Sequence, residues 1–441
     1  MHDIMNSTLS APDFERAGER MYALACEIFP ISRSLTGDGV RTTLNLMRRR
    51  VPLDVHEVPT GTQVFDWAVP KEWNIRAGHI KDAAGNTIVD FANSNLHVVG
   101  YSTPVRARLP LAELKKHLFT LPDQPDVIPF RTSYWSENWG FCLSHAQASQ
   151  LADGDYDVLI DSTLANGAMS YGEYLHRGTS EDEFLLTAHI CHPSLANDNC
   201  SGLALLTTLA EHLRGMRTRY SYRFLFSPGT IGPITWLAHN EAHAGRIKHG
   251  LVVSGVGDAG GPTYKRSRRG DAGIDRIMAH VLQHAVANAV VMDFEPYGYD
   301  ERQFCSPGFD LPVGLLQRSK FATFPQYHTS ADNLDFIAPE HLAASLEIVW
   351  RAIEIAERDA VPRNLSPKGE PQLGRRGLYA ATAGDKDGPA RAMAMLWVLN
   401  QADGTKSLLG IAERAKLPFD VVEAAARTLA AAGLLALDAI A

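Results

Sequence analysis

The 441-residue sequence predicts a three-layer α/β fold with a mostly parallel or mixed sheet. Three observations indicate this fold. Buried-strand and helical patterns alternate between residues 184 and 358, which is typical of a parallel sheet covered by helices. A segment rich in aromatic, glycine, proline and asparagine residues interrupts the chain at 61–160. Short helical patterns follow a proline- and charge-rich linker at 359–375.

The chain is predicted to begin with two helices, because apolar residues recur with helical spacing over 13–29 and again over 40–49. From Gly61 short aromatic runs are separated by turn residues, so we expect a mainly β insertion over 61–160. Its last predicted strand, 156–160, is expected to lead back into the α/β pattern.

The α/β region itself consists of short apolar runs alternating with longer amphipathic stretches. This alternation favours parallel strands with helices on both faces of the sheet. We expect strands at 184–188, 222–226, 250–254 and 311–316, and helices at 201–213, 233–243, 273–287 and 338–358.

Three further helices are predicted at 389–399, 407–415 and 418–432, a pattern typical of a winged-helix or helix-turn-helix module. A DNA-reading helix would be basic, but the third helix carries Asp420 and Glu423 against Arg427 alone. The pattern therefore favours a structural or protein-contact role over nucleic-acid binding.

The composition is that of a soluble globular protein, with 45% apolar and 21% charged residues. A net charge of −8 argues against non-specific binding to nucleic acids or membrane surfaces. There is no apolar run near the roughly 20 residues that span a bilayer and no signal-peptide pattern. Five scattered cysteines without a CxxC pair suit a reducing compartment, so we expect a cytoplasmic protein, and a homo-oligomer stays open.

Residues 185–202, LLTAHICHPSLANDNCSG, hold the densest group of metal-binding side chains. A predicted strand ends at His189, His192 follows, and the next loop carries Asp198. Imidazole and carboxylate groups at a strand end suit zinc or a similar divalent ion, whereas the plainer interpretation is a polar loop with a helix cap. Later loops place Asp300, Glu301 and His328 at other ends of α/β connections, from which they can approach this group.

The motifs AHIC…NDNCSG, FSPGTIG, YDERQF…GFDLP and YHTSADN, in this order, resemble the zinc aminopeptidase superfamily over about residues 180–340. HICHPSLANDNCSG and IPFRTSYWSENWGFCL more closely resemble a bacterial branch of aminopeptidase-like proteins, often linked with surface-polysaccharide biosynthesis. The resemblance implies an aminopeptidase/phosphorylase-like fold and three domains. They are a zinc domain at 1–60 and 161–360, an insertion at 61–160, and a winged-helix domain at 370–441.

By the same resemblance, His189 matches the first metal-binding histidine, Asp198 the bridging aspartate and His328 the last histidine. The superfamily's Glu-Glu pair is replaced by the segment 227–230, SPGT, and its next aspartate ligand by Ser254. The resemblance therefore implies one zinc ion with three protein ligands. His192 is a fourth candidate, either as a ligand or as a group that orients Asp198.

Without the Glu-Glu pair, another carboxylate has to accept and pass on a proton. We expect Glu301 to do so, with a surface salt bridge to Arg302 as the plain alternative. Asp300 is the second choice, or a group that positions His328. Arg302 could hold a substrate carboxylate or an oxyanion, although a structural ion pair is the simpler interpretation.

Three other segments could take part in binding. Arg33 lies in a polar segment, 30–41, that either reaches the site or caps a helix. Glu173 and the Trp135/Trp139 cluster could form a rim for a free amino group. The basic run 265–269, KRSRR, is interpreted as solvated surface or, alternatively, as a site for an anionic substrate.

These observations predict a metal-dependent hydrolase of small peptides or amides, aminopeptidase-like. One alternative keeps the metal but changes the reaction to deacylation or cyclisation of a non-peptide amide, linked to polysaccharide biosynthesis. Another is a catalytically silent scaffold with a structural metal. Similarity of fold cannot decide among them.

Overall fold

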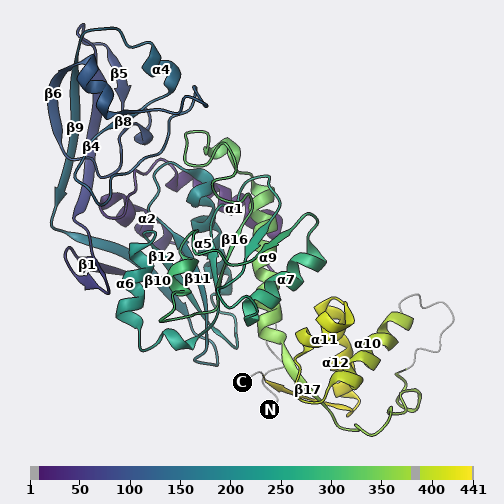
Figure 1. Ribbon diagram of the computed structural model, residues 1–441. Coiled ribbons are helices and arrows are strands. Elements are labelled where there is room, and N and C mark those ends of the chain that lie inside the picture. Colours follow the sequence, from purple (N-terminus) through teal and green to yellow (C-terminus); the bar gives the residue numbers. More distant parts are fainter. Residues whose placement is uncertain (1–8, 379–387, 440–441) are drawn as a thin grey trace.

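The computed structural model describes residues 9–378 and 388–439. Figure 1 shows a central α/β unit between a β-rich insertion at one end and a small, mainly helical part at the other. Within the described residues there is no helix long and apolar enough to cross a membrane.

The central unit is built on an eight-stranded mixed sheet, which confirms the predicted fold class. Its four inner strands are parallel, and antiparallel strands lie towards both edges. Every residue of the inner strand β11 is buried, which explains its unbroken apolar sequence. In sheet order the strands are β1 (Asp54–Pro59), β10 (Ala168–His176), β12 (Ser221–Ser227), β11 (Glu183–His189), β13 (Ile247–Val253), β16 (Val313–Gln317), β14 (Thr263–Lys265) and β15 (Val290–Met292).

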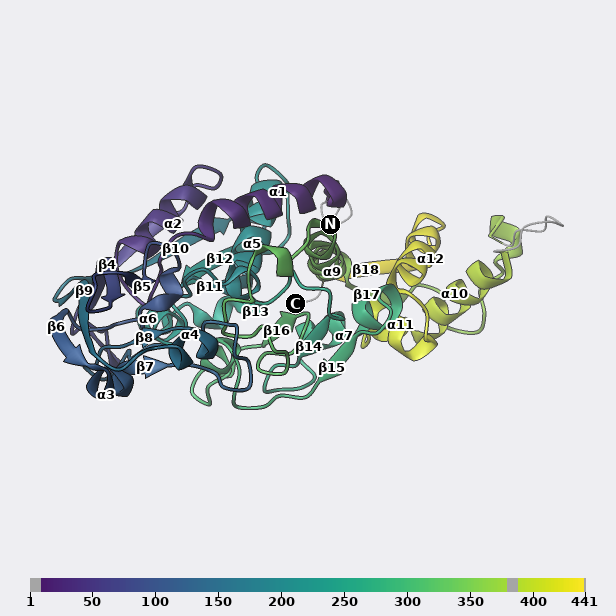
Figure 2. The ribbon, with the colours of Figure 1, turned by 90° about the horizontal axis from the view of Figure 1, so that it is seen from above.

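Helices cover both faces of this sheet (Figure 2). One face packs against α1 (Phe14–Ile28), α2 (Asp38–Arg48), α5 (Gly202–Leu213), α7 (Gly273–Ala285) and α9 (Pro339–Arg358). The other face packs against α6 (Ile231–Asn240) and α8 (Glu301–Phe304). Glycine is required where α5 begins, because a Cβ at Gly202 would lie 2.4 Å from the carbonyl oxygen of Val253.

The insertion forms an antiparallel sheet of its own, in the order β5-β4-β9-β6. The strand predicted at 156–160 belongs to this sheet as part of β9, which pairs with both β4 and β6, and the chain then leads directly into β10 of the main sheet. The buried and more exposed residues of β9 alternate, as in a sheet with one solvated face. The elements are β2 (Gln63–Val64), β3 (Trp67–Ala68), β4 (Glu72–Lys81), β5 (Thr87–Asp90), β6 (Val105–Pro110), α3 (Leu111–Leu114), β7 (Leu118–Phe119), β8 (Phe141–Cys142), α4 (His145–Ser149) and β9 (Asp155–Ala165).

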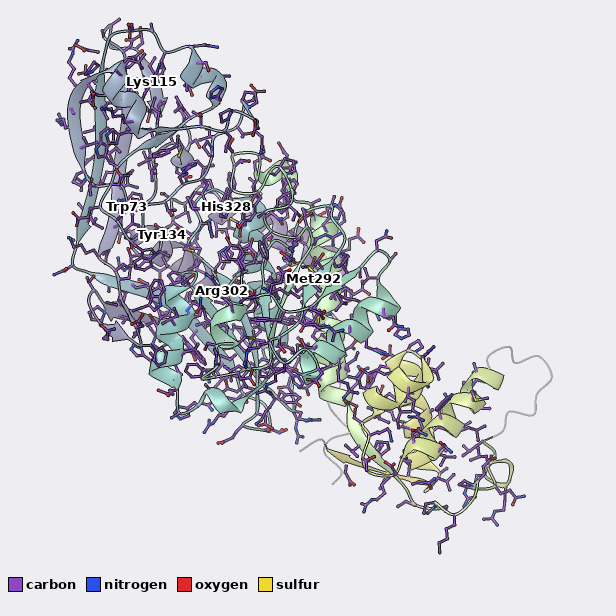
Figure 3. The ribbon with its side chains drawn as sticks, in the orientation of Figure 1. Trp73, Lys115, Tyr134, Met292, Arg302 and His328 are labelled. Atoms are coloured by element: carbon purple, nitrogen blue, oxygen red, sulfur yellow. The ribbon has the colours of Figure 1, made fainter. Side chains whose placement is uncertain are left out.

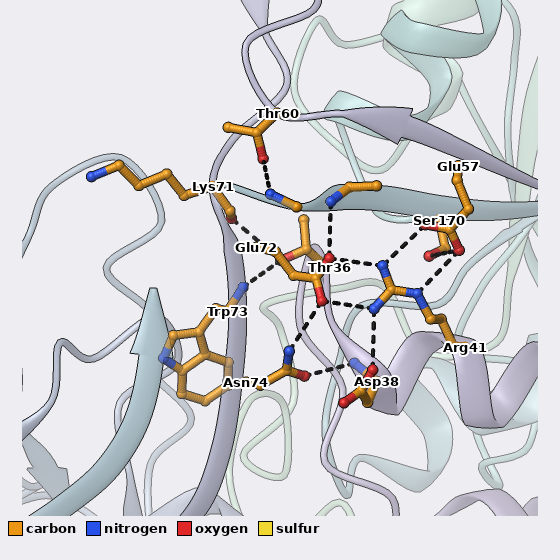
Figure 4. Close-up of polar contacts among 12 residues, drawn as sticks. Thr36, Asp38, Arg41, Glu57, Thr60, Lys71, Glu72, Trp73, Asn74 and Ser170 are labelled. Atoms are coloured by element: carbon orange, nitrogen blue, oxygen red, sulfur yellow. Dashed lines mark hydrogen bonds and ion pairs between the residues drawn. The ribbon is translucent and has the colours of Figure 1, made fainter. Parts of the chain in front are cut away.

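The polar segment 30–41 joins the insertion to the central unit (Figure 4). The Arg41 guanidinium donates to Glu57 on β1 at 3.0 and 3.1 Å and to Glu72 on β4 at 2.7 Å through two nitrogens. Thr36 Oγ1 accepts a hydrogen bond from the Trp73 amide at 3.0 Å. The segment therefore holds two sheets together, a role that its sequence alone did not indicate.

We expect Glu72→Gln to weaken this junction in a pH-dependent way. Hydrogen bonding to Arg41 lowers the pKa of Glu72 from 4.5 to about 2. Because the folded-state pKa is the lower one, the carboxylate stabilises the fold above pH 4.5 and loses that effect as the pH falls towards 2. The variant should lose about 1–2 kcal/mol at pH 7.

Urea unfolding followed by tryptophan fluorescence at pH 7 and pH 3 measures the effect. The difference between variant and wild type should shrink at the lower pH. Glu113→Gln is the matched control, since its pair with Lys116 is solvent-exposed. An identical loss at both pH values would contradict the assignment.

The C-terminal part consists of α10 (Gly388–Gln401), α11 (Leu408–Ala415), α12 (Phe419–Ala431) and two paired strands, β17 (Ala360–Asn364) and β18 (Leu435–Ala439). The predicted linker 359–375 thus contains a strand, β17, which pairs with β18 to form the two-stranded wing of the winged-helix module. The Phe419 amide donates to His280 Nε2 on α7 at 3.0 Å, and Arg276 pairs with Glu413 at 2.5 Å. The module is therefore attached to the central unit through α7.

Candidate functional site

The carboxyl end of β11 supplies the first side chain of the site, His189. The chain continues through His192 into a short helical segment, Ala196–Ser201, that carries Asp198. Both His189 and Asp198 are almost completely buried, at 2% and 1% exposure. The strand end and the following loop therefore place an imidazole and a carboxylate together, as the sequence predicts.

Asp198 lies between two imidazoles. His189 Nε2 is 2.9 Å from Asp198 Oδ1, and His328 Nε2 is 3.0 Å from Asp198 Oδ2. The possible ligand atoms of His189, His192 and Asp198 all lie within 4.8 Å of one another. The structure thus brings together the four side chains that the sequence proposes as metal ligands.

The protonation states of this group suit a divalent cation. Burial alone would raise the pKa of Asp198, but His192, His189 and His328 together hold it well below its usual range. Burial lowers the pKa of His192 well below 6.5, so its imidazole is neutral. Three imidazole nitrogens and one carboxylate are a donor set that zinc prefers, so the residues fit such an ion.

Asp332 fixes the loop around Asp198. Its carboxylate accepts hydrogen bonds from the amides of Asn197 at 2.6 Å and Asp198 at 3.0 Å. Burial raises the pKa of Asp332 to about 8. Asp332 does not cap the closing helix α9, whose N-cap is Ala338. Asp332 instead orients the candidate ligand Asp198 through these two backbone amides.

A cavity of about 170 Å³ opens beside the three histidines and Asp300. It is smaller than the roughly 300–1,000 Å³ of sites for drug-sized ligands, so it accommodates a small chemical group. Tyr299 stacks on His189 at 5.1 Å and Tyr327 on His328 at 4.0 Å between ring centres. The cavity is lined by Leu35, Tyr134, His189, Cys191, His192, Gly229, Thr230, Tyr297, Gly298, Tyr299, Asp300, Phe321, Tyr327 and His328.

The insertion supplies one wall of this cavity through the segment 128–134. The Phe130 amide donates to the carbonyl oxygen of His328 at 2.8 Å, and its ring lies 5.1 Å from that of His192 and 5.2 Å from that of His328. Tyr134 lines the cavity itself. Figure 3 labels Tyr134, His328 and Arg302 where the insertion meets the central unit. The site is thus built from both parts.

Asp300 is the carboxylate that faces the cavity. Its Oδ1 accepts a hydrogen bond from the Thr230 amide at 2.7 Å, and Oδ2 is buried with no hydrogen-bond partner among the described residues. Burial raises the pKa of Asp300, although His189 opposes this shift. A buried carboxyl group with a raised pKa can take up a proton more readily than an exposed aspartate.

Glu301, the first choice from the sequence, does not line the cavity. It is fully buried and pairs with Lys265 Nζ at 2.5 Å. Asp300 precedes α8 and Glu301 is its first residue, and the two neighbouring side chains point in different directions. The geometry therefore does not favour Glu301 for this role, and Asp300 is the carboxylate that reaches the cavity.

The proposed binding residues have different positions. Arg302 lies at the edge of the cavity, where it donates to Thr230 Oγ1 at 3.3 Å. Arg33 is buried and donates to Cys200 Sγ at 3.3 Å. It therefore contacts the helical segment that carries Asp198 and does not line the cavity. Glu173 is held in the sheet by an ion pair with Arg223 and a bond from Trp236 Nε1 at 3.1 Å, which leaves it outside the cavity lining.

The two tryptophans of the predicted aromatic rim lie in different surroundings. Trp135 is 54% exposed and directly follows Tyr134 of the cavity wall. Trp139 instead stacks on His117 within the insertion, at 3.6 Å between ring centres. The lining tyrosines Tyr134, Tyr299 and Tyr327 were not predicted. The only signal for them is the frequency of aromatic residues in YWSENW, YGYDER and QYHT, which core packing explains equally well.

The structure also locates the departures from the aminopeptidase pattern. A Cβ at Gly229 would lie 3.4 Å from Cys191 Sγ, 3.8 Å from His189 Cβ and 3.9 Å from Asp300 Oδ1. A side chain at 229 would thus begin next to these three residues, and glycine brings no carboxylate there. Ser254 Oγ lies 3.5 Å from Asp198 Oδ1, where it offers a hydroxyl instead of an acidic ligand.

The sequence of residues 22–359 matches the model of a family described as a domain of unknown function (DUF4910), and residues 360–437 match a winged helix-turn-helix model. The chain belongs to the DUF4910 family. Its winged-helix part agrees with the prediction for the C-terminal segment. Family membership extends over the central unit and the insertion but assigns no reaction.

A relative from Clostridium acetobutylicum is 50% identical over 420 residues, covering 95% of this chain and 96% of the relative. It is described provisionally as a polysaccharide biosynthesis protein with an aminopeptidase-like domain. A crystal structure of a protein from the same organism, provisionally a peptidase, has a TM-score of 0.91 and 48% identity, covering 96% of this chain and 97% of that one.

A zinc aminopeptidase from Bacillus subtilis has a TM-score of 0.57 at 14% identity, covering 79% of this chain and 96% of that one. Identity at this level shows a shared fold. The DUF4910 chain thus has an aminopeptidase-like α/β fold followed by a winged-helix domain.

Proposed function

We propose that this protein is a metal-dependent hydrolase of peptide or other amide bonds, aminopeptidase-like, with one divalent ion, most suitably zinc. The observation that carries the proposal is a small cavity lined by His189, His328 and a buried carboxylate, Asp300, with Asp198 in contact with both imidazoles. The peptidase and aminopeptidase-like descriptions of the Clostridium acetobutylicum proteins support the same reaction class.

His189, Asp198 and His328 would hold the ion, with His192 as a fourth ligand or as a neighbour that orients Asp198. When bound, a zinc ion polarises a carbonyl group and makes water easier to deprotonate at neutral pH. The protein contributes a rigid, buried donor set, since Asp332 holds the Asp198 loop through two amides. Tyr299 and Tyr327 stack on two of the imidazoles and fix their planes.

Asp300 would accept a proton from water and pass it to the leaving amine. In the aminopeptidase pattern that carboxylate comes from the segment aligned with 227–230. Here a Cβ at Gly229 would lie 3.4 Å from Cys191 Sγ and 3.9 Å from Asp300 Oδ1. The carboxylate of Asp300 therefore lies near the place where the missing side chain would begin, although it comes from another loop.

The size of the cavity limits the substrate. About 170 Å³ accommodates one small residue or acyl group, and the rest of the substrate would extend past Trp135 and Tyr297, which are 54% and 67% exposed. A small peptide or an amide with a short acyl group meets this limit. The polysaccharide description of the relative favours, as a second candidate, deacylation of an amide on a sugar.

An activity screen of the zinc-loaded protein tests the proposal. We expect hydrolysis of aminoacyl-amide or short N-acyl substrates, loss of that activity after chelation, and recovery when zinc is restored. Amine release is the measurement, and the two substrate sets separate the aminopeptidase from the deacylase reaction. A protein that binds zinc yet hydrolyses neither set would favour a structural metal in a silent scaffold.

A further inference from the structure

The buried pair of Lys265 and Glu301 has no role in the proposed reaction, yet it lies directly under the loop that carries Asp300. Lys265 is 1% exposed and Glu301 is fully buried. The sequence placed Lys265 in a basic loop, interpreted as solvated surface or a site for an anionic substrate. Its burial corrects both interpretations for Lys265, whereas the side chains of Arg268 and Arg269 in the same run are 45% exposed.

The Lys265 ammonium has two hydrogen-bond acceptors and one ion-pair partner. It donates to the carbonyl oxygens of Glu295 at 3.0 Å and Tyr297 at 2.8 Å, and it pairs with the Glu301 carboxylate at 2.5 Å. An ammonium group has three hydrogens, and two of them are thus bonded to backbone carbonyl groups. All three partners belong to one stretch of chain, 295–301, which follows β15 and reaches the first residue of α8.

This stretch supplies four of the residues that line the cavity, Tyr297, Gly298, Tyr299 and Asp300. It lies directly against the ammonium, since a Cβ at Gly298 would be 2.6 Å from Lys265 Nζ and 2.2 Å from Glu301 Oε1. The strand that carries Lys265, β14, is hydrogen-bonded to β16 within the main sheet. The ammonium thus attaches the cavity loop to a rigid strand at both ends of the loop.

We infer that Lys265 is a positioning residue for the cavity loop and sets the place of Asp300 and Tyr299. This inference rests on the proposed function for its effect on the reaction. Replacing a buried ion pair by apolar residues is often neutral for stability. An apolar pair, however, leaves the carbonyl groups of Glu295 and Tyr297 without their donor, and the loop loses two of its attachments.

The double variant Lys265→Met with Glu301→Leu separates positioning from stability. We expect a thermal midpoint and a zinc content close to wild type, but a kcat about 10- to 100-fold lower, because a misplacement of the order of 1 Å is costly in a reacting site. Amide hydrogen exchange over 295–301 should become about tenfold faster or more. Glu301→Gln keeps the ammonium and both carbonyl acceptors, so it should be less stable yet retain most of its kcat and its slow exchange.

Gly298→Ala provides a second variant that leaves both charges in place, in case the double variant does not fold. Its Cβ would displace the loop from the ammonium, so the same loss of kcat and faster exchange are expected. Unchanged kcat and exchange in these variants would overturn the inference and leave Lys265 as an ordinary buried ion pair. If the wild type hydrolyses no amide, the proposed function fails, while the exchange measurement still decides whether Lys265 holds the loop.

Discussion

Asp198→Ala and His189→Ala should each abolish metal binding, from about one zinc ion per chain to almost none. Asp198 is the carboxylate that touches both His189 and His328, one on each oxygen atom. Its loss removes the anionic ligand and separates the two imidazoles. The loss of His189 leaves a site with too few ligands for tight tetrahedral coordination.

Metal analysis of purified protein, dialysed after zinc loading, measures this effect. Ser254→Ala is the matched control, because its hydroxyl lies 3.5 Å from Asp198 Oδ1 but is a poor zinc ligand. The control should keep its metal, and circular dichroism should show that all three variants are folded. Full zinc content in both ligand variants would refute the proposed site.

Asp300→Asn should lower kcat by about 10²- to 10⁴-fold, the usual contribution of a positioned acid–base group. The amide has the shape of the carboxylate but cannot take up a proton from water. Zinc content should be unchanged, because Asp300 is not one of the side chains whose possible ligand atoms group with Asp198. Glu301→Gln makes the same change one residue further on, where the side chain faces Lys265, and should have a much smaller effect on kcat.

The pH dependence gives a second measure of Asp300. Burial raises its pKa above 3.8, so the carboxyl is protonated at pH values where an exposed aspartate is charged. Wild-type kcat/KM should therefore rise with pH through that raised pKa, as the carboxylate needed as base appears. Asp300→Asn should lack this rise. If kcat/KM of Asp300→Asn rises with pH as it does in the wild type, a group other than Asp300 causes the rise.

The fold could be predicted well because its signals are local. Apolar runs give the buried strands, and helical periodicity gives α1, α5, α9 and the three helices of the winged-helix module. The strand at 156–160 was recognised as the last strand of the insertion, but the strands that it pairs with were not predicted. Which sheet a strand joins depends on its hydrogen-bonding partners, and β4 lies about eighty residues earlier in the chain.

The candidate ligands were also predictable, since the residue types zinc prefers cluster at predicted strand ends. The choice between Asp300 and Glu301 was not, because neighbouring residues at a helix start point in different directions. That choice depends on Lys265, which becomes a buried partner only when β14 packs into the sheet. Charge runs in a sequence do not reveal which of their members are buried.

The wall formed by residues 128–134 has a consequence for how this family can diversify. The candidate ligands come from strand ends and loops of the central sheet, whereas Phe130 and Tyr134 come from a separate sheet. Substitutions, or exchange of the whole inserted segment, can alter which molecules fit the cavity while the ion-holding residues stay as they are. The insertion's part of the cavity wall is thus encoded in a different stretch of the gene from the candidate ligands, and it can change without altering them.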